Sequence, residues 1–213
     1  KMKTNHNQLR AVLLTVTAMV LLVSGLTYAD NIYVSRANGT IEKFDSSGNR
    51  STFASGLDQP YGLAFDRNGN LYVAFEITGT IEKFDSSGNK STFASGLNTP
   101  IGLEFDSSDN LYATSFQGGT IYKFDTSGNK STFASGLNGP DGLAFDSSGY
   151  LYVVNHQGWT IDKFDSSGNR STFASGLGSP HDIVFDSSGY LYTSAAGSIY
   201  KFDTSGNRST FAS

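Results

Sequence analysis

A period of 40 residues runs through the chain from Asn31 onward, and it constrains the fold more than any other feature. Residues 71–110 read LYVAFEITGTIEKFDSSGNKSTFASGLNTPIGLEFDSSDN, and residues 111–150 read LYATSFQGGTIYKFDTSGNKSTFASGLNGPDGLAFDSSGY. The units at 31–70 and 151–190 match them at most positions, and a shortened unit covers 191–213. Such self-similarity is typical of architectures in which one supersecondary unit stacks on the next.

Each repeat contains four short segments rich in β-branched and aromatic residues, namely GLAFD, LYVAF, TIEKFD and KSTFAS. These compositions favour strands, and turn sequences separate them. No helical period occurs after residue 30. Because four strands in about 40 residues make one propeller blade, we predict an all-β fold, a β-propeller of four-stranded antiparallel blades.

Turns of the form Asp-Ser-Ser-Gly-Asn follow the first and third strand segments of each repeat. The Asp can accept hydrogen bonds from backbone amides of the turn, and the Gly supplies the positive φ that closes a hairpin. Calcium binding is the alternative, but each turn offers one carboxylate, whereas Ca²⁺ takes 6–8 oxygen ligands. The motif therefore predicts turn chemistry.

The pattern P-x-G-L-A-F-D-x-x-G-N-L-Y-V-A followed by T-I-x-K-F-D-x-x-G-N resembles the NHL repeat. That family is related to the SMP-30/gluconolactonase (regucalcin-like) and streptogramin-lyase-like six-bladed propellers. The resemblance spans the chain after the N-terminal segment and implies the fold without fixing an activity. It also implies that the P-x-G-L-A-F-D strand is innermost in each blade and the S-T-F-A-S strand outermost.

With that strand order, residues 31–55 supply only three outer strands of a partial first blade. Complete blades are expected at 62–95, 102–135, 142–175 and 182–213. In closed propellers of this family the missing inner strand usually comes from the C-terminus. We therefore expect about five blades, from a C-terminally truncated six-bladed ring; the alternative is an open or gapped five-bladed ring with unpaired strand edges.

The first 29 residues have the composition of a secretory signal peptide. Lys1, Lys3 and Arg10 precede an apolar run at 11–26, and Ala29 suits a signal-peptidase site. We predict cleavage there, which leaves a propeller domain at 30–213; an uncleaved membrane anchor is the alternative. The expected location is secreted, periplasmic or at the cell surface of a bacterium, with no membrane attachment after cleavage.

The predicted mature chain is acidic and contains no cysteine. It has 12 Lys and Arg against 19 Asp and Glu, a net charge of −7. This charge disfavours nucleic acid and anionic membranes as partners. We expect a monomer that binds a protein, a carbohydrate or a small molecule.

Two sets of loops vary between repeats, and recognition side chains are expected there, near the mouth of the central channel. Their polar departures concentrate in the last two complete blades. The candidate binding residues are Tyr61, Glu76, Asp141, Asn155, His156, Trp159, His181 and Asp182. His and Asp together could hold a divalent cation, calcium or another, or act as a general base. The alternative is drift in exposed loops, with Trp159 a blade-packing or rim residue rather than a sugar platform.

Near-identity of the blades favours a non-enzymatic binding or structural scaffold, because an enzyme usually breaks symmetry to build one asymmetric site. The alternative is a cation-dependent lactonase, which is a hydrolase, or a lyase, with its site at the channel mouth around Asp141, Asn155, His156 and His181. No catalytic role is assigned to any residue.

Overall fold

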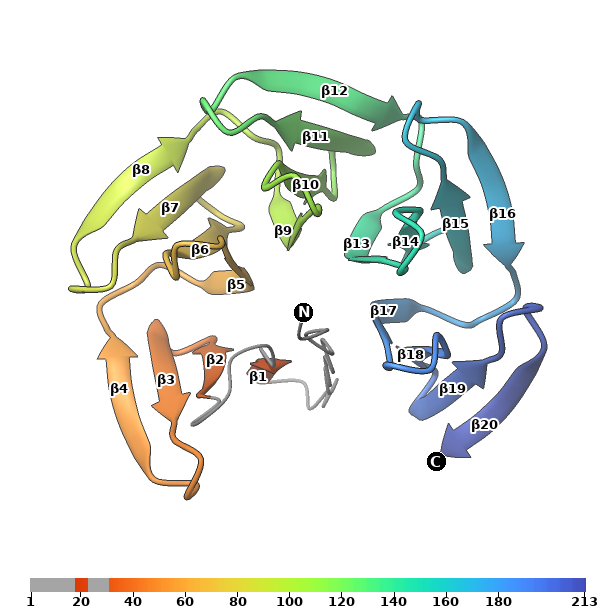
Figure 1. The fold of residues 1–213 in the computed structure, drawn as a ribbon, viewed down its shortest axis with the longest axis horizontal. Helices are drawn as coiled ribbons and strands as arrows, with labels where there is room; N and C mark the ends of the chain where they lie inside the picture. Colours follow the sequence, from red (N-terminus) through yellow and green to blue (C-terminus); the bar gives the residue numbers. More distant parts are fainter. Residues whose placement is uncertain (1–17, 23–30) are drawn as a thin grey trace, which may run out of the picture.

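The four strand segments of each repeat form one antiparallel sheet, and five such sheets stand around a common axis in the computed structural model (Figure 1). The structure describes residues 18–22 and 31–213. Within these residues no helix occurs, and none is therefore long and apolar enough to cross a membrane. The predicted all-β propeller of four-stranded blades is confirmed.

Strand order follows chain order from the axis outward in every blade, as the resemblance implied. Blade 1 contains β1 (Ala18–Leu22), β2 (Ile32–Arg36), β3 (Thr40–Phe44) and β4 (Arg50–Ala54). Blade 2 contains β5 (Pro60–Phe65), β6 (Leu71–Phe75), β7 (Thr80–Phe84) and β8 (Lys90–Ala94). Blade 3 contains β9 (Pro100–Phe105), β10 (Leu111–Ser115), β11 (Thr120–Phe124) and β12 (Lys130–Ser135). Blade 4 contains β13 (Pro140–Phe145), β14 (Leu151–Asn155), β15 (Thr160–Phe164) and β16 (Arg170–Ala174). Blade 5 contains β17 (Pro180–Phe185), β18 (Leu191–Ala195), β19 (Ser198–Phe202) and β20 (Arg208–Ala212).

The expected blade boundaries differ from the observed ones by a residue or two, because each inner strand of blades 2–5 begins at the proline itself. Pro140, for example, pairs with Asn155 at the start of β13. Proline is tolerated at the first position of a strand, where its missing N–H removes little of the ladder.

Blade 1 differs from the sequence expectation. Residues 31–55 were expected to lack an inner strand, but β1 pairs antiparallel with β2 and completes a four-stranded sheet. This pairing occupies the backbone groups on the inner edge of β2, which would otherwise stay open. Residues 18–22 belong to the predicted signal peptide, whose other residues, 1–17 and 23–29, lie outside the described part of the chain. A chain cut after Ala29 would lose β1.

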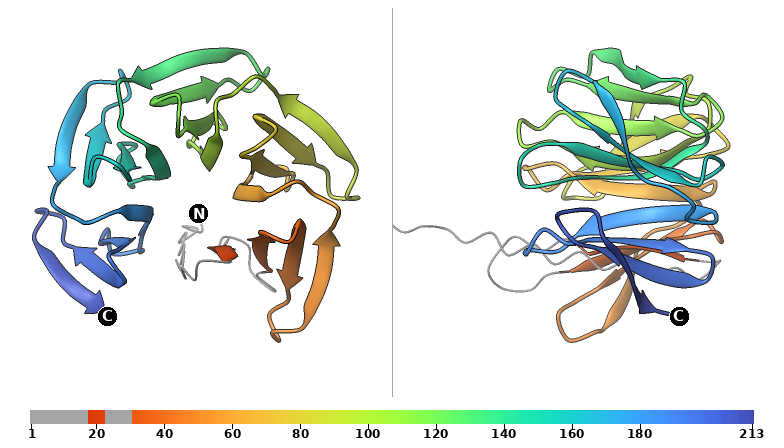
Figure 2. Two further views of the ribbon diagram at one scale, coloured as in Figure 1. Left: turned by 180° about the vertical axis from the view of Figure 1, so that it is seen from behind. Right: turned by 90° about the vertical axis from the view of Figure 1, so that its right-hand side faces the viewer.

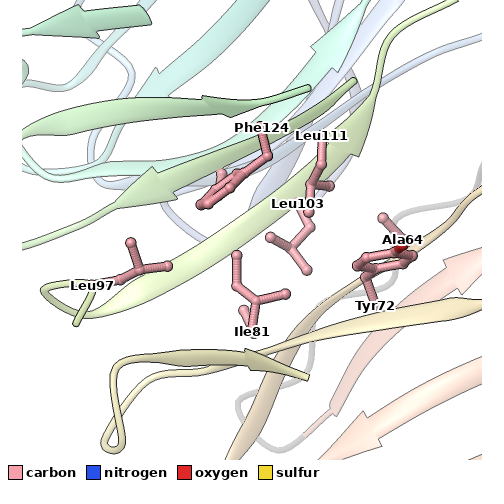
Figure 3. Close-up of a cluster of buried hydrophobic side chains, with 9 residues drawn as sticks. Ala64, Tyr72, Ile81, Leu97, Leu103, Leu111 and Phe124 are labelled. Atoms are coloured by element: carbon pink, nitrogen blue, oxygen red, sulfur yellow. The ribbon is translucent and has the colours of Figure 1, made fainter. Parts of the chain in front are cut away.

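Aromatic side chains join each blade to the next. In blade 2, the Tyr72 ring packs edge-on against Phe93 of its own blade and Phe105 of blade 3, with centroid distances of 4.9 and 5.0 Å. Phe93 in turn contacts Phe124 at 5.3 Å. Figure 3 shows Tyr72 and Phe124 with the aliphatic side chains of the same buried cluster, including Ile81. The same three contacts recur between every consecutive pair of blades, so burial of aromatic side chains holds each blade to the next.

The face of blade 5 that points away from blade 4 does not have these interblade contacts. Tyr192 packs on Phe211 at 5.2 Å, as its counterparts do, but Phe211 is 63% exposed. In the described residues, no extensive packing joins the strands of blade 5 to those of blade 1. Figures 1 and 2 show the two blades as the ends of an open arc, with the C-terminus on the outer strand of blade 5.

The Asp turns have the predicted hydrogen bonds. Asp125 Oδ1 accepts from the backbone amides of Ser127 and Asn129 at 2.9 Å each, and its Oδ2 accepts from the Asn129 side-chain amide at 2.8 Å. Gly128 has φ 83°. The carboxylate is thus satisfied within its own turn, which confirms turn chemistry for this motif.

Candidate functional site

Two positions of the repeat lie at the same end of the inner two strands, close to the ring axis. The first is the residue after the proline of each inner strand, which is Tyr61, Ile101, Asp141 or His181 in blades 2–5. The second is the residue that ends or follows the second strand of each blade. Its five representatives are Arg36, Glu76, Phe116, His156 and Ala196. The proline that precedes the first position pairs with the last residue of the second strand in blades 2–5, so the two positions are neighbours.

Asp141, His156 and His181 come together at these positions, and we call them the inner-rim cluster. One potential ligand atom from each lies within 4.8 Å of the others. His181 Nδ1 is 3.3 Å from Asp141 Oδ2, and the imidazole centroids of His156 and His181 are 4.4 Å apart. Three of the eight candidate residues from the sequence therefore form one compact group.

A backbone contact orients the His156 ring. Its Nδ1 lies 3.1 Å from the carbonyl oxygen of Pro180, and a carbonyl can only accept a hydrogen bond. Nδ1 therefore donates this hydrogen bond, and Nε2 is the ring nitrogen that remains for a metal ion or another partner. Such a second-sphere hydrogen bond is typical of metal-binding histidines. Phe116 packs against the ring at 5.8 Å and limits its movement.

Burial and pairing set the charge state of the cluster. Asp141 is 5% exposed, and this burial raises the pKa of its carboxyl group, whereas the His181 hydrogen bond opposes the rise. The same hydrogen bond raises the pKa of His181 above its usual 6.5. Burial, and then the charges of Asp141, Glu76 and Asp182, raise the pKa of the Tyr61 hydroxyl.

A glycine in the inner strands of blades 2–4 allows the backbones of successive blades to approach at this end. A Cβ on Gly102 would lie 2.4 Å from the carbonyl oxygen of Asp141. One on Gly142 would lie 2.9 Å from the carbonyl oxygen of His181 and 2.3 Å from Asp182 Oδ1. Thr114 Oγ1 also donates to the Asp141 carbonyl at 2.8 Å. These close approaches place the Asp141 backbone between β9 of blade 3 and β17 of blade 5.

Asn155 lies elsewhere. It is 1% exposed, and its side-chain amide donates to Thr160 Oγ1 at 3.0 Å and to Asp162 Oδ2. Asp162 is fully buried and forms an ion pair with Arg170 at 2.6 Å. Asn155 thus belongs to a polar network between β14, β15 and β16, not to the inner-rim cluster.

Trp159 is a rim residue, 54% exposed, in the turn that also contains His156. Its φ of 56° is in the left-handed region, where the matching positions in blades 1–3 hold Gly39, Gly79 and Gly119. Its carbonyl accepts a hydrogen bond from Leu177 N at 3.2 Å. Phe116 is the neighbour that sequence reasoning missed; its repeat position, shared with Glu76 and His156, was the available signal.

Two imidazoles and one carboxylate are a donor set for Zn²⁺ or another first-row transition metal. They do not suit Ca²⁺, which takes 6–8 oxygen ligands. Three protein ligands leave at least one coordination position for water or a bound molecule. Without a metal, the Asp141–His181 pair can hold and move a proton.

Comparison with known proteins identifies the architecture. Residues 50–74 match a family model described as a beta-propeller repeat. No curated protein sequence matches the chain. Several solved structures share its fold at low sequence identity.

A gluconolactonase from Xanthomonas campestris superposes with a TM-score of 0.77 at 19% identity, over 92% of this chain and 79% of that one. Virginiamycin B lyase from Staphylococcus aureus, solved with quinupristin, gives 0.73 at 18%, over 88% and 68%. A chain of a nidogen/laminin complex gives 0.78 at 23%, over 86% and 76%. The expected resemblance to lactonase- and lyase-like propellers is confirmed at the level of the fold.

Proposed function

We propose that this chain is an exported binding scaffold that holds a divalent transition-metal ion at the inner-rim cluster and binds its ligand there. The observation that carries the proposal is the approach of one ligand atom each from Asp141, His156 and His181 to within 4.8 Å. Two of these residues replace apolar residues found at the same repeat positions: Asp141 replaces Ile101, and His156 replaces Phe116.

Metal binding requires an ionised Asp141 and an unprotonated His181, so it displaces the proton of the hydrogen bond between them. His156 Nδ1 is engaged with the Pro180 carbonyl, so Nε2 is the nitrogen that can coordinate, and His181 Nδ1 faces the Asp141 carboxylate. A bound ion would provide a Lewis-acid centre with an open position for an oxygen or nitrogen atom of a small molecule, a carbohydrate or a protein side chain.

Export is proposed from the N-terminal sequence. The chain has no cysteine, so it needs no particular redox environment. The net charge of −7 after residue 29 keeps the domain soluble and disfavours nucleic acid. We propose that the domain acts as a monomer.

Calorimetric titration of the purified chain with ZnCl₂ tests the proposal, after treatment with EDTA and dialysis. We expect one zinc ion per chain, with binding weakened at least tenfold in His181→Ala and in His156→Ala. Asp125→Asn serves as the control, because it removes a carboxylate that is satisfied within a distant turn. Unchanged binding in both histidine variants would refute the proposal.

A cation-dependent hydrolase or lyase is the second candidate. It is favoured by the open coordination position beside a His–Asp pair, and by the fold shared with a lyase and a gluconolactonase. Lactone hydrolysis measured with zinc, with EDTA and with His181→Ala tests it. Activity that requires both zinc and His181 would support catalysis, whereas zinc binding without turnover would support the scaffold.

A further inference from the structure

The three residues of the inner-rim cluster come from two different blades. Asp141 is the second residue of β13 and His156 follows β14, so both belong to blade 4. His181 is the second residue of β17 in blade 5. A metal ion held by all three would therefore cross the interface between these blades.

The equivalent positions at the preceding interface are mainly apolar. The counterparts of Asp141, His156 and His181 there are Ile101, Phe116 and Asp141, and Ile101 is 5% exposed. Apolar side chains at this position contribute to blade packing through burial alone. Between blades 4 and 5, the corresponding side chains are polar and titratable, so a metal can replace the lost apolar contact.

Blade 5 also has less packing than the inner blades. Its core contacts are with blade 4, through Tyr152, Phe173 and their partners Phe185 and Phe202. Ile199 is only half-buried, while the matching isoleucines of blades 1–4 are fully buried. Because stability in a repeat array comes from contacts between neighbours, a blade with one packed neighbour opens more readily than a blade packed on both sides.

We infer that the metal clamps blade 5 onto blade 4, so that cation binding controls local opening of the last blade. This inference rests on the proposed metal site. Detachment of blade 5 removes His181 from Asp141 and His156, which leaves an incomplete ligand set. The ion therefore binds the closed arrangement more tightly than the open one and shifts the equilibrium toward closure.

The size of the effect follows from mass action. At a free zinc concentration of 100 times the Kd, a ligand that binds only the closed form lowers the open population about 100-fold. The opening of blades that do not contribute ligands, such as blade 2, stays unchanged. The clamp is thus distinguished from general stabilisation by where the protection occurs.

Hydrogen exchange of the full chain, followed by mass spectrometry of peptides from each blade, tests the inference with and without ZnCl₂ at 100 times the measured Kd. We expect about 100-fold slower exchange of the core amides in β17, β18 and β19, and no change in β5–β7. His181→Ala should abolish the zinc effect. The comparison of wild type with and without zinc does not depend on the folding of any variant.

If calorimetry shows zinc binding through the histidines but exchange in blade 5 is unaltered, the clamp is refuted while the metal site stands. Equal protection of all blades would also refute it. Absence of zinc binding in calorimetry would overturn the metal site and the clamp together.

Discussion

Replacement of Phe124 with alanine measures how strongly the blades depend on their aromatic contacts. Phe124 is 2% exposed, lies in a buried cluster with Leu111 and Ile81, and contacts Phe93 of the preceding blade at 5.3 Å. Truncation of a buried phenylalanine costs about 3–5 kcal/mol, because apolar burial is lost and a cavity remains. The contact with Phe93 places the expected loss in this range rather than below it.

The matched control is Phe211→Ala. Phe211 occupies the same repeat position as Phe93 but is 63% exposed and contacts only the Tyr192 ring among the described aromatic groups. Its loss should cost less than about 1.5 kcal/mol, the size of one aromatic pair. Urea denaturation with linear extrapolation gives both values. A loss below about 1 kcal/mol for Phe124→Ala, or equal losses for the two variants, would refute the account of interblade packing.

Four further outcomes are expected. Arg170→Ala leaves the fully buried Asp162 without its cation and should lower the free energy of unfolding by about 3–5 kcal/mol in the urea assay. Arg208→Ala is its control, because it removes a cation–π contact with Tyr200 and should cost about 1 kcal/mol or less. Trp159→Gly should raise the midpoint of thermal unfolding, because a left-handed backbone costs a non-glycine residue about 1–2 kcal/mol, while Gly119→Ala should lower it. The Asn129 side chain lowers the pKa of Asp125 below 3.8 in the folded state, so the ionised carboxylate stabilises the fold above pH 3.8, and this stability is lost as the pH falls through the lowered pKa. Asp125→Asn should therefore flatten the fall of stability between about pH 5 and 2. An unchanged pH dependence would contradict this. Mass spectrometry of the exported chain should show loss of residues 1–29, and an intact N-terminus would contradict the predicted cleavage.

The repeat allowed most of the fold to be predicted. Strand order, turn chemistry and the buried Phe124 position all follow from a pattern that recurs every 40 residues. The β1 strand could not be predicted in this way, because residues 18–22 do not match the P-x-G-L-A-F-D pattern. Their pairing with β2 follows from the open edge of that strand and not from a sequence signal.

The candidate site was predicted in part. Asp141, His156 and His181 were recognised because they depart from the repeat, and ring geometry brings them together. The orientation of Asn155 depends on strand pairing instead. Because Asn155 pairs with Thr160 and Val153 pairs with Asp162, Asn155 and Asp162 are diagonal neighbours on one face of the sheet. Residue type alone, without this register, could not distinguish a network inside blade 4 from the inner rim.

Anomalous diffraction from crystals grown with one equivalent of zinc tests the central claim most directly. The account predicts a single zinc ion between Asp141, His156 and His181, with nitrogen ligands at about 2.0–2.1 Å and a carboxylate oxygen at about 2.0–2.2 Å. An ion bound elsewhere on the chain, or no ordered zinc at the inner-rim cluster, would contradict it.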